Sequence, residues 1–220
     1  MDITRNSPIL KRNKINNDYN ENAGSYAKNY NIDRKKVHEE LIPYLLEMPK
    51  RALILDPAAG SLADANMLLN DDIFSEKDFR VVACEPAECL KKEGLTLYPG
   101  LDENERISIL SREIPRLDGI DDNRFNLVLA SAVWQELHPD DRFKAFECLS
   151  SKLIIGGLLY VTLKMGREIE MKPRGQYPVS FEELKNLAGE LGLTIIPTKE
   201  PRQDTFGRNI GWKTFLARKN

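Results

Sequence analysis

The fold is decided by the segment Ala52-Leu-Ile-Leu-Asp56-Pro-Ala-Ala-Gly60-Ser-Leu-Ala-Asp64. An apolar run ends in an acid, and small residues then form a tight turn that leads into a helix. A continuous apolar run is typical of a strand that is covered on both faces of a parallel sheet. Ligands of such sheets bind at the carboxyl ends of the strands, where small side chains let the backbone come close. The segment therefore predicts a strand, a turn and a helix, with a binding site at the turn.

Apolar runs and helical segments alternate along the rest of the chain. The predicted strands are 52–56, 80–85, 107–110, 125–132, 158–164, 193–198 and 212–218. The predicted helices between them are 61–70, 87–94, 140–153 and 181–191. No helix pattern fits the polar loop before the last strand, so the final pair is predicted to be antiparallel. The pattern indicates an α/β fold: a Rossmann-like, doubly wound, mostly parallel seven-stranded sheet with an antiparallel C-terminal strand and helices on both faces.

Capping residues mark several helix boundaries. Ser180 and Glu183 form a capping box at the start of the helix 181–191. Asp33 caps an earlier helix, which Pro43 is expected to kink or restart. The pair at 156–157, Gly-Gly, is predicted to end the helix 140–153.

Composition and charge exclude several classes of protein. The chain has 220 residues, with 32 Lys and Arg against 34 Asp and Glu, so it has no basic excess for a nucleic-acid partner. The longest apolar stretch, 153–163, is too short to span a bilayer, and the N-terminus has no secretory pattern. Three cysteines without metal-ligand spacing are typical of free thiols. We expect a cytoplasmic protein with no membrane segment and no metal site; the oligomeric state is not predicted.

The first 31 residues differ from the rest, because eight of them are Asn and few are large and apolar. We interpret 1–31 as a mobile N-terminal arm and 32–220 as the folded domain. Tyr26 and Tyr30 lie where the arm meets the domain. They are predicted either to close over a bound ligand or to anchor the arm to the core.

Two acids follow consecutive predicted strands. Asp56 ends the first strand and Glu85, followed by Pro86, ends the second. A carboxylate in the second position can accept hydrogen bonds from both hydroxyls of a ribose. Together the acids predict a nucleoside site. A dinucleotide would need a glycine-rich turn for its pyrophosphate, and Asp56 would repel that group but attract a cationic amino-acid moiety. These features favour S-adenosylmethionine.

At these motifs the sequence resembles the class I S-adenosylmethionine-dependent methyltransferases, over the part from Tyr26 to the C-terminus. The matching motifs are LILDPAAGSLADA (53–65), VVACEPAECL (81–90), FNLVLASAVWQEL (125–137) and LIIGGLLYVTLKMG (153–166). The ending TFGRNIGWKTFLAR (205–218) is similar to a small bacterial single-domain subgroup. The resemblance implies that 32–220 is a methyltransferase-like domain with S-adenosylmethionine as cofactor.

The resemblance also implies site residues. Asp56, Ala58 and Gly60 would border the methionine part of the cofactor, and Glu85 with Pro86 would hold the ribose. The remaining cofactor residues would be Ser111, Arg112, Ser131 and Ala132. The family's first motif usually reads D-x-G-x-G-x-G, whereas here Ala58 and Leu62 replace two glycines. The acid that usually contacts adenine is replaced by Ser111-Arg112.

Candidate residues for the methyl acceptor follow the fourth strand and the loop 171–177. Trp134 and Tyr177 are predicted to contact a small-molecule substrate, and His138 is a candidate general base. The alternative for His138 is a partly exposed loop histidine. The predicted function is methyl transfer to a small-molecule nucleophile. Two alternatives stay open: a catalytically degraded protein of the same fold that acts as a binding or interaction module, and a nicotinamide-dependent oxidoreductase.

Overall fold

The computed structural model describes residues 8–165, 175–204 and 210–220. Parts of two predicted features, the loop 171–177 and the ending 205–218, lie outside the described residues. The elements in chain order are α1 (Pro8–Glu21), α2 (Ala23–Tyr30), α3 (Arg34–Val37), α4 (Ile42–Glu47), β1 (Leu53–Asp56), α5 (Ala63–Asn70), η2 (Asp72–Phe74), β2 (Arg80–Cys84), α6 (Glu88–Leu97), β3 (Ile107–Leu110), β4 (Phe125–Ala130), η3 (Trp134–Glu136), α7 (Pro139–Lys152), β5 (Leu153–Met165), α9 (Phe181–Glu190), β6 (Leu193–Ile196), β7 (Arg202–Gln203) and β8 (Gly211–Lys219).

The strands form one sheet in the order β3-β2-β1-β4-β5-β8-β6, and the two-residue strand β7 pairs with β8. The pairs from β3 to β5 are parallel. Strand β8 runs antiparallel to β5, β6 and β7. The predicted doubly wound, mostly parallel sheet with an antiparallel C-terminal strand is confirmed. The described sheet has eight strands instead of seven because β7 was not predicted.

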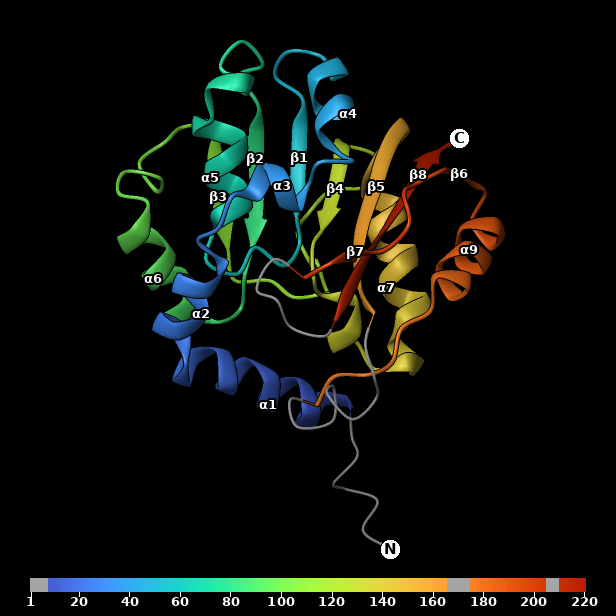
Figure 1. Ribbon diagram of the computed structural model, residues 1–220, viewed down its shortest axis with the longest axis horizontal. Helices are drawn as coiled ribbons and strands as arrows, with labels where there is room; N and C mark the ends of the chain where they lie inside the picture. Colours follow the sequence, from blue (N-terminus) through green and yellow to red (C-terminus); the bar gives the residue numbers. More distant parts are fainter. Residues whose placement is uncertain (1–7, 166–174, 205–209) are drawn as a thin grey trace, which may run out of the picture.

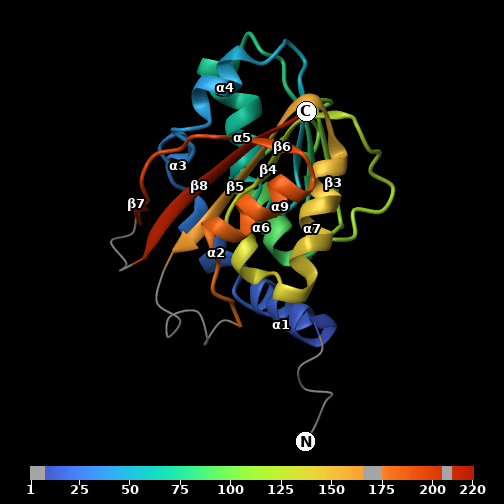
Figure 2. The same ribbon diagram turned by 90° about the vertical axis from the view of Figure 1, so that its right-hand side faces the viewer.

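Each face of the sheet has its own apolar core. Neighbouring strand residues alternate between the faces, as Ile54 and Leu55 do in β1. One face packs against α7 and α9, through Phe146 and Leu184 among others. The other packs against α4 and α5, and the edge-on view shows the sheet between the two layers (Figure 2). Both faces are buried, so the central strands read as continuous apolar runs.

The glycine pair does not end a helix. Helix α7 ends at Lys152, and Gly156 and Gly157 lie inside β5, where the register with β4 shifts. Gly156 has φ +79°, and a Cβ on Gly157 would lie 3.0 Å from the carbonyl oxygen of Phe125. The prediction was wrong because glycine serves a bulge and a close strand approach as well as a helix end. The caps at Asp33 and Ser180 are confirmed, and the chain restarts as α4 at Ile42, with Pro43 in its first turn.

The arm expected for 1–31 contains two helices in its described part. Helix α2 packs on α6 through Ala23, Ala27 and Leu90. Helix α1 lies across the lower edge of the sheet, below the carboxyl ends of β1 and β2, in both views (Figures 1 and 2). The mobility of the arm and the boundary at residue 31 stay predictions. The arrangement places α1 and α2 next to the edge where ligands of such sheets bind.

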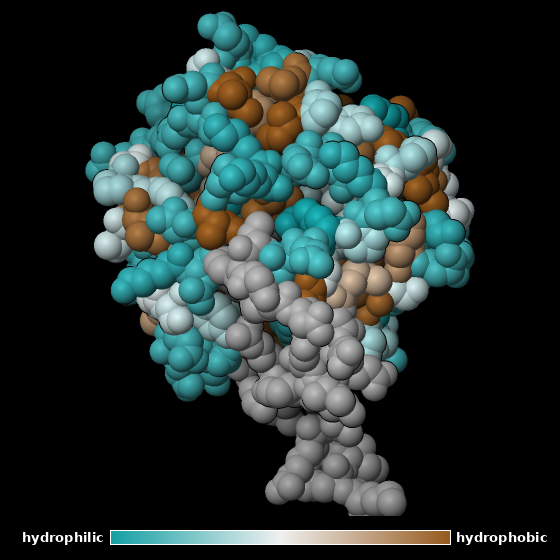
Figure 3. Space-filling model, viewed as in Figure 1, coloured by the Kyte–Doolittle hydropathy of each residue, from teal (hydrophilic) through white to brown (hydrophobic). Residues whose placement is uncertain are grey.

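The surface facing the viewer in Figure 3 is mostly hydrophilic, and its apolar patches are small and separate. Within the described ranges, no helix combines the length and the apolar character that crossing a membrane requires.

Candidate functional site

A cavity lies at the carboxyl ends of β1, β2, β4 and β5, between the sheet and helices α1 and α2. Six of the residues predicted for a cofactor line it: Tyr26, Ala58, Gly60, Glu85, Ser131 and Ala132. Other lining residues come from segments far apart in the chain, among them Tyr19, Arg34, Asp64, Glu136, Lys164 and Trp212. The sheet topology therefore brings most of the predicted cofactor residues together.

The turn after β1 contains two residues with left-handed backbone, Gly60 with φ +53° and Leu62 with φ +63°. Leu62 is fully buried in the core under α5 and does not line the cavity. Ala58 lines the cavity and is not among the described residues with positive φ. The replaced glycines therefore act differently: Leu62 strains the backbone of the turn, whereas Ala58 only adds a methyl group to the wall.

Glu85 joins the end of β2 to this turn. Its Oε2 accepts the N–H of Gly60 at 2.9 Å, and its Oε1 accepts the N–H of Ala87 at 2.8 Å. Burial raises the pKa of Glu85, and the two backbone hydrogen bonds oppose that rise. Each carboxylate oxygen can accept a second hydrogen bond, so Glu85 keeps acceptor capacity toward the cavity it lines.

Asp56 is fully buried at the end of β1 and does not line the cavity. Its Oδ1 accepts the N–H of Ala58 at 3.4 Å, while its Oδ2 has no hydrogen-bond partner among the described residues. Burial and then the nearby charge of Asp64 raise the pKa of Asp56 well above its usual range.

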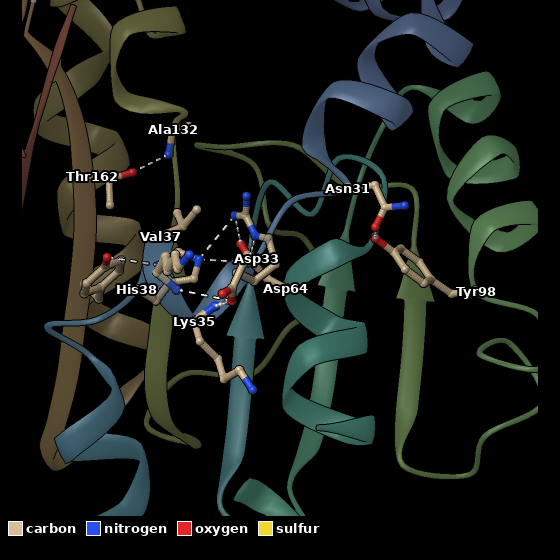
Figure 4. Close-up of polar contacts among 12 residues, drawn as sticks. Asn31, Asp33, Lys35, Val37, His38, Asp64, Tyr98, Ala132 and Thr162 are labelled. Carbon is tan, nitrogen blue, oxygen red and sulfur yellow. Dashed lines mark hydrogen bonds and ion pairs between the residues drawn. The ribbon is translucent and has the colours of Figure 1, made fainter. Parts of the chain in front are cut away.

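A second acid near the turn is paired, and we call its surroundings the Asp64 cluster: Arg34, His38, Asp64 and Tyr160. Arg34 forms two hydrogen bonds to the Asp64 carboxylate, at 2.5 and 2.8 Å. The Nε2 of His38 lies 2.8 Å from the same carboxylate, and its Nδ1 lies 3.0 Å from the Tyr160 hydroxyl. Figure 4 shows the side chains of His38 and Asp64 pointing toward each other. The cluster ties α3 to α5 and β5.

The cluster fixes the protonation of its members. Although burial opposes ionisation of Asp64, the charge of Arg34 and the hydrogen bonds from Arg34 and His38 hold its pKa well below the usual range. Burial lowers the pKa of His38, so the imidazole is neutral. The carboxylate beside Nε2 requires a proton there, which leaves Nδ1 to accept the Tyr160 hydroxyl proton.

A third acid, Glu136 of η3, also lines the cavity, and we call its surroundings the Glu136 cluster: Tyr19, Glu136, Lys164 and Gln176. The Tyr19 hydroxyl of α1 donates to Oε1 of Glu136. The Lys164 ammonium donates to Oε1 of Gln176 at 2.8 Å. Burial raises the pKa of Glu136 to about 7, and the charge of Glu85 adds to this rise. The hydrogen bonds from Tyr19 and Gln176 and the charge of Lys164 oppose it.

A hydrogen bond between the backbone of Ala132 and the side chain of Thr162 fixes the part of the cavity wall that follows β4. Ala132 has φ +54°, and its N–H donates to Oγ1 of Thr162 at 2.7 Å (Figure 4). This bond fixes the chain that leaves β4, and thus the position of the residues before η3.

Several predicted residues lie outside the cavity lining: Asp56, Pro86, Ser111, Arg112, Trp134, His138 and Tyr177. The side chain of Tyr30, the last residue of α2, lies outside the described part of the chain. Ser111 donates to Glu88, and the Nε of Arg112 donates to the carbonyl oxygen of Asp118. These contacts hold the loop after β3 against α6 instead of facing the cavity.

The predicted acceptor-side residues have structural contacts. Trp134 is fully buried, with its ring edge-on to Phe146 in the core, because η3 turns its apolar side inward. His138 caps α7, where its Nδ1 accepts the N–H of Asp140 at 3.3 Å, and its ring lies edge-on to Tyr177. The structure therefore does not place these three side chains where a ligand in the cavity would meet them.

Other residues, to which the sequence analysis gave no role, make the main polar contacts around the cavity. Arg34 and His38 lie in no quoted motif, whereas Asp64 and Glu136 lie within the motifs 53–65 and 125–137 but were given no role. Their single sequence signal was a charged side chain within or beside an apolar pattern. No group of three or more His, Cys, Asp and Glu in the described ranges is arranged to hold a metal ion.

No protein-family model matches the chain, and no curated protein is significantly similar to it. Solved structures do match. The 1,6-didemethyltoxoflavin-N1-methyltransferase of Burkholderia thailandensis, bound to 1,6-didemethyltoxoflavin and S-adenosylhomocysteine, is 17% identical, with a TM-score of 0.66 over 97% of this chain and 91% of that one. The N-methyltransferase NodS of Bradyrhizobium japonicum is 15% identical, with a TM-score of 0.61 over 84% and 96%.

A third match has a different activity. The [4+2]-cyclase SpnF is 16% identical, with a TM-score of 0.61 over 86% of this chain and 84% of that one. A shared fold therefore does not fix the reaction. Strand order, the cavity at the carboxyl edge and these similarities together show that the chain has the Rossmann-like fold of class I S-adenosylmethionine-dependent methyltransferases.

Proposed function

We propose that the protein is an S-adenosylmethionine-dependent methyltransferase that acts on a small molecule. The observation that carries this proposal is the position of Glu85. Its carboxylate is held by the N–H of Gly60 from the turn after β1, and it lines the cavity. An acid at the end of β2, fixed against a glycine turn, is suited to bind the ribose of a nucleoside.

The residues present fit such a cofactor. A Cβ at Gly60 would meet only the Cδ2 atom of Leu90, at 3.9 Å, so there is room beside the backbone of the turn. Ser61 also lines the cavity, and its Oγ is buried without a hydrogen-bond partner among the described residues. A bound ligand would supply the hydrogen bond that this hydroxyl lacks.

When bound, the cofactor supplies a methyl group on a positively charged sulfur. The residues of the chain would bind the cofactor, orient it and shield it from water. Glu85 would accept the ribose hydroxyls, and Gly60 would allow close approach of the backbone. Tyr26 of α2 and Tyr19 of α1 border the cavity and reduce the access of water. Alignment in a desolvated site contributes most of the rate of a direct displacement.

A small-molecule acceptor is favoured over a macromolecule. The cavity lies partly under α1 and α2, and the chain has no basic excess for a nucleic acid. Two of the similar structures are methyltransferases with small-molecule or N-methyl chemistry in their names. We extend that class of substrate to this chain as part of the proposal.

One observation favours a second function, a ligand-binding module without catalysis. Leu62 holds a left-handed backbone at the start of α5, where the methyltransferase motif has glycine. A strained turn of this kind costs about 1–3 kcal/mol and is a departure from the motif at the cofactor. Binding with no methyl transfer would support this second function.

The test is calorimetry with S-adenosylhomocysteine on the wild type, Glu85→Ala and the exposed control Glu76→Ala. We expect the wild type and the control to bind, and Glu85→Ala to lose about 1.5–3 kcal/mol, which is roughly 10–150-fold in affinity. Equal affinity of Glu85→Ala and wild type would refute the ribose assignment. If the wild-type protein does not bind S-adenosylhomocysteine but binds a reduced nicotinamide dinucleotide, the proposed methyltransferase function is refuted.

A further inference from the structure

We infer that Glu136 is the general base that takes a proton from the substrate bound in this cavity, and that this substrate, the methyl acceptor, is an amine. This inference rests on the proposed function, because it assigns chemistry to the same site. It gives Glu136 the role that the sequence suggested for His138.

The backbone directs Glu136 toward the cavity. In a 3₁₀ helix, residues three apart lie on the same side. Trp134, the first residue of η3, and Leu137, which follows it, are both buried in the core. Glu136 lies on the other side of η3 and lines the cavity. The fully buried anchor Trp134 thus fixes the direction of the carboxylate.

Polar groups from three further segments surround this carboxylate. From α1, the Tyr19 hydroxyl donates to it, and the Asp18 carboxylate accepts the Tyr26 hydroxyl at 2.6 Å. From β5 and the segment before α9, Lys164 and Gln176 form the far side, joined by their own hydrogen bond at 2.8 Å.

Charges also face Glu136 from the other sides of the cavity. Glu85 approaches from the end of β2, and its charge acts on Glu136. Near β7 and β8, the lining contains Arg202 and Asp204, and Asp204 accepts the indole N–H of Trp212 at 2.9 Å. The site around Glu136 is therefore a desolvated pocket with an acid and aromatic rings on its walls.

These surroundings suit proton transfer near neutral pH. Burial raises the pKa of Glu136 to about 7, against the hydrogen bond from Tyr19. A general base is most effective when its pKa is close to the operating pH. The carboxylates of Asp64 and Asp56 lack this property, because the pKa of Asp64 is well below its usual range and Asp56 does not line the cavity.

An amine fits this pocket better than an oxygen or sulfur nucleophile. An amine enters as an ammonium ion, which the carboxylates of Glu136 and Asp18 attract. The rings of Tyr19 and Tyr26, which line the cavity, can also stabilise a cation. The positive charge of Lys164 also acts on this side of the cavity, but the acids Glu136, Asp18 and Glu85 outnumber it, so a phenolate or thiolate is disfavoured.

The step balances in protons and electrons. An oxygen of Glu136 takes one N–H proton from the ammonium, which frees the nitrogen lone pair. That lone pair forms the bond to the methyl carbon, and the carbon–sulfur bond breaks with its electron pair left on sulfur. The product is the N-methylated ammonium ion, which carries the positive charge that leaves sulfur, and Glu136 later returns its proton to water.

The first experiment measures methyl transfer from pH 5.5 to 9. The acceptors are sarcosine, ethanolamine, phosphoethanolamine and tyramine, with catechol and 2-mercaptoethanol for comparison. We expect the wild type to methylate at least one amine, with a rate that rises with pH up to about 7. Glu136→Gln keeps a partner for Tyr19 but accepts no proton, so it loses roughly 10²–10⁴-fold in kcat and also loses the rise with pH. The exposed control Glu147→Gln should keep the wild-type kcat and the rise of the rate with pH.

The second experiment needs no turnover. Carbon-13 NMR of labelled glutamate carboxyls, in the complex with S-adenosylhomocysteine, identifies Glu136 by the resonance that is absent in Glu136→Gln. We expect its midpoint near pH 7, and a higher midpoint in Tyr19→Phe, because the hydrogen bond that favours the carboxylate is lost.

The outcomes separate the two proposals. Failure of the wild type to bind S-adenosylhomocysteine overturns the proposed function. With binding intact, the inference on Glu136 is overturned by a midpoint below about pH 5, or by Glu136→Gln with an unchanged rate and pH profile. Methylation of only catechol or 2-mercaptoethanol, or of no compound in the panel, overturns the amine assignment.

Discussion

Two acids that line the cavity, Asp64 of α5 and Glu136 of η3, differ in the groups that surround them. Asp64 faces Arg34 in a two-point contact and His38 at 2.8 Å. Glu136 accepts hydrogen bonds from the neutral groups of Tyr19 and Gln176, and the ammonium of Lys164, which bonds Gln176, acts on it by its charge. Burial acts against ionisation at both positions.

The pKa values of the two acids move in opposite directions. That of Asp64 lies well below its usual range, because the cation Arg34 outweighs burial. That of Glu136 rises to about 7, because nothing outweighs burial there. A carboxylate that stays ionised beside a cation holds elements together, whereas one that titrates near neutral pH can move a proton. The Asp64 cluster is thus structural and the Glu136 cluster chemical, a division that can be tested.

The largest expected effect comes from removing the charge of Asp64. Asp64→Asn leaves the largely buried Arg34 without its counter-charge, and such a change destabilises by about 3–5 kcal/mol. Urea unfolding followed by circular dichroism measures the loss. The control Asp72→Asn, at an exposed position, should stay within about 0.5 kcal/mol. A loss for Asp64→Asn as small as that of the control would mean that the Asp64 cluster does not hold α3 and α5 together.

The next effect concerns Leu62, whose left-handed turn begins the helix that carries Asp64. Leu62→Gly relieves about 1 kcal/mol of backbone strain but removes a fully buried side chain, so we expect a net loss of about 2–4 kcal/mol in the same urea assay. Arg51→Gly is the matched control, because Arg51 has φ +62° but is exposed. It should be neutral or stabilised by up to about 1 kcal/mol. Stabilisation by both variants would show that strain, and not burial, dominates at Leu62.

The sequence predicted the parts of the site that lie close together in the chain. Asp56, Gly60 and Glu85 each follow a strand directly, and the apolar runs fix where the strands end. Six predicted cofactor residues therefore line the cavity. The strand order followed from the same alternation, since consecutive parallel units place their turns at one edge.

The Asp64 cluster could not be predicted in this way. Its four residues come from three segments, and His38 and Tyr160 are 122 positions apart. No local spacing records such contacts. Glu136 was visible, but His138 was preferred because free imidazole titrates near pH 6.5. Only burial shows that the carboxyl titrates near neutral pH and that the histidine is a helix cap.

A pH series distinguishes the two acids by the sign of their effects on stability. The pKa of Glu136 is raised on folding, so its contribution is fully present below about pH 4.5 and is lost as pH rises through about 7. The unfolding free energy of wild type minus that of Glu136→Gln should fall by about 3 kcal/mol over that window. The pKa of Asp64 is lowered, so the corresponding difference for Asp64→Asn is present above about pH 4 and is lost below it. Equal slopes for the two variants would contradict the division.

The smallest expected effects come from the two tyrosines that bond these clusters. Tyr160 is fully buried, so Tyr160→Phe leaves Nδ1 of His38 without a donor, and we expect a loss of about 1–2 kcal/mol in unfolding free energy. Tyr19 borders the cavity, where water can replace its hydroxyl, so Tyr19→Phe should cost at most about 0.5 kcal/mol. The NMR titration of Glu136 should reverse this order: its midpoint rises in Tyr19→Phe and is unchanged in Tyr160→Phe. If Tyr19→Phe destabilised the protein as much as Tyr160→Phe and left the midpoint in place, Glu136 would be a structural acid like Asp64, and the proton-transfer role would have to lie with another group in the cavity.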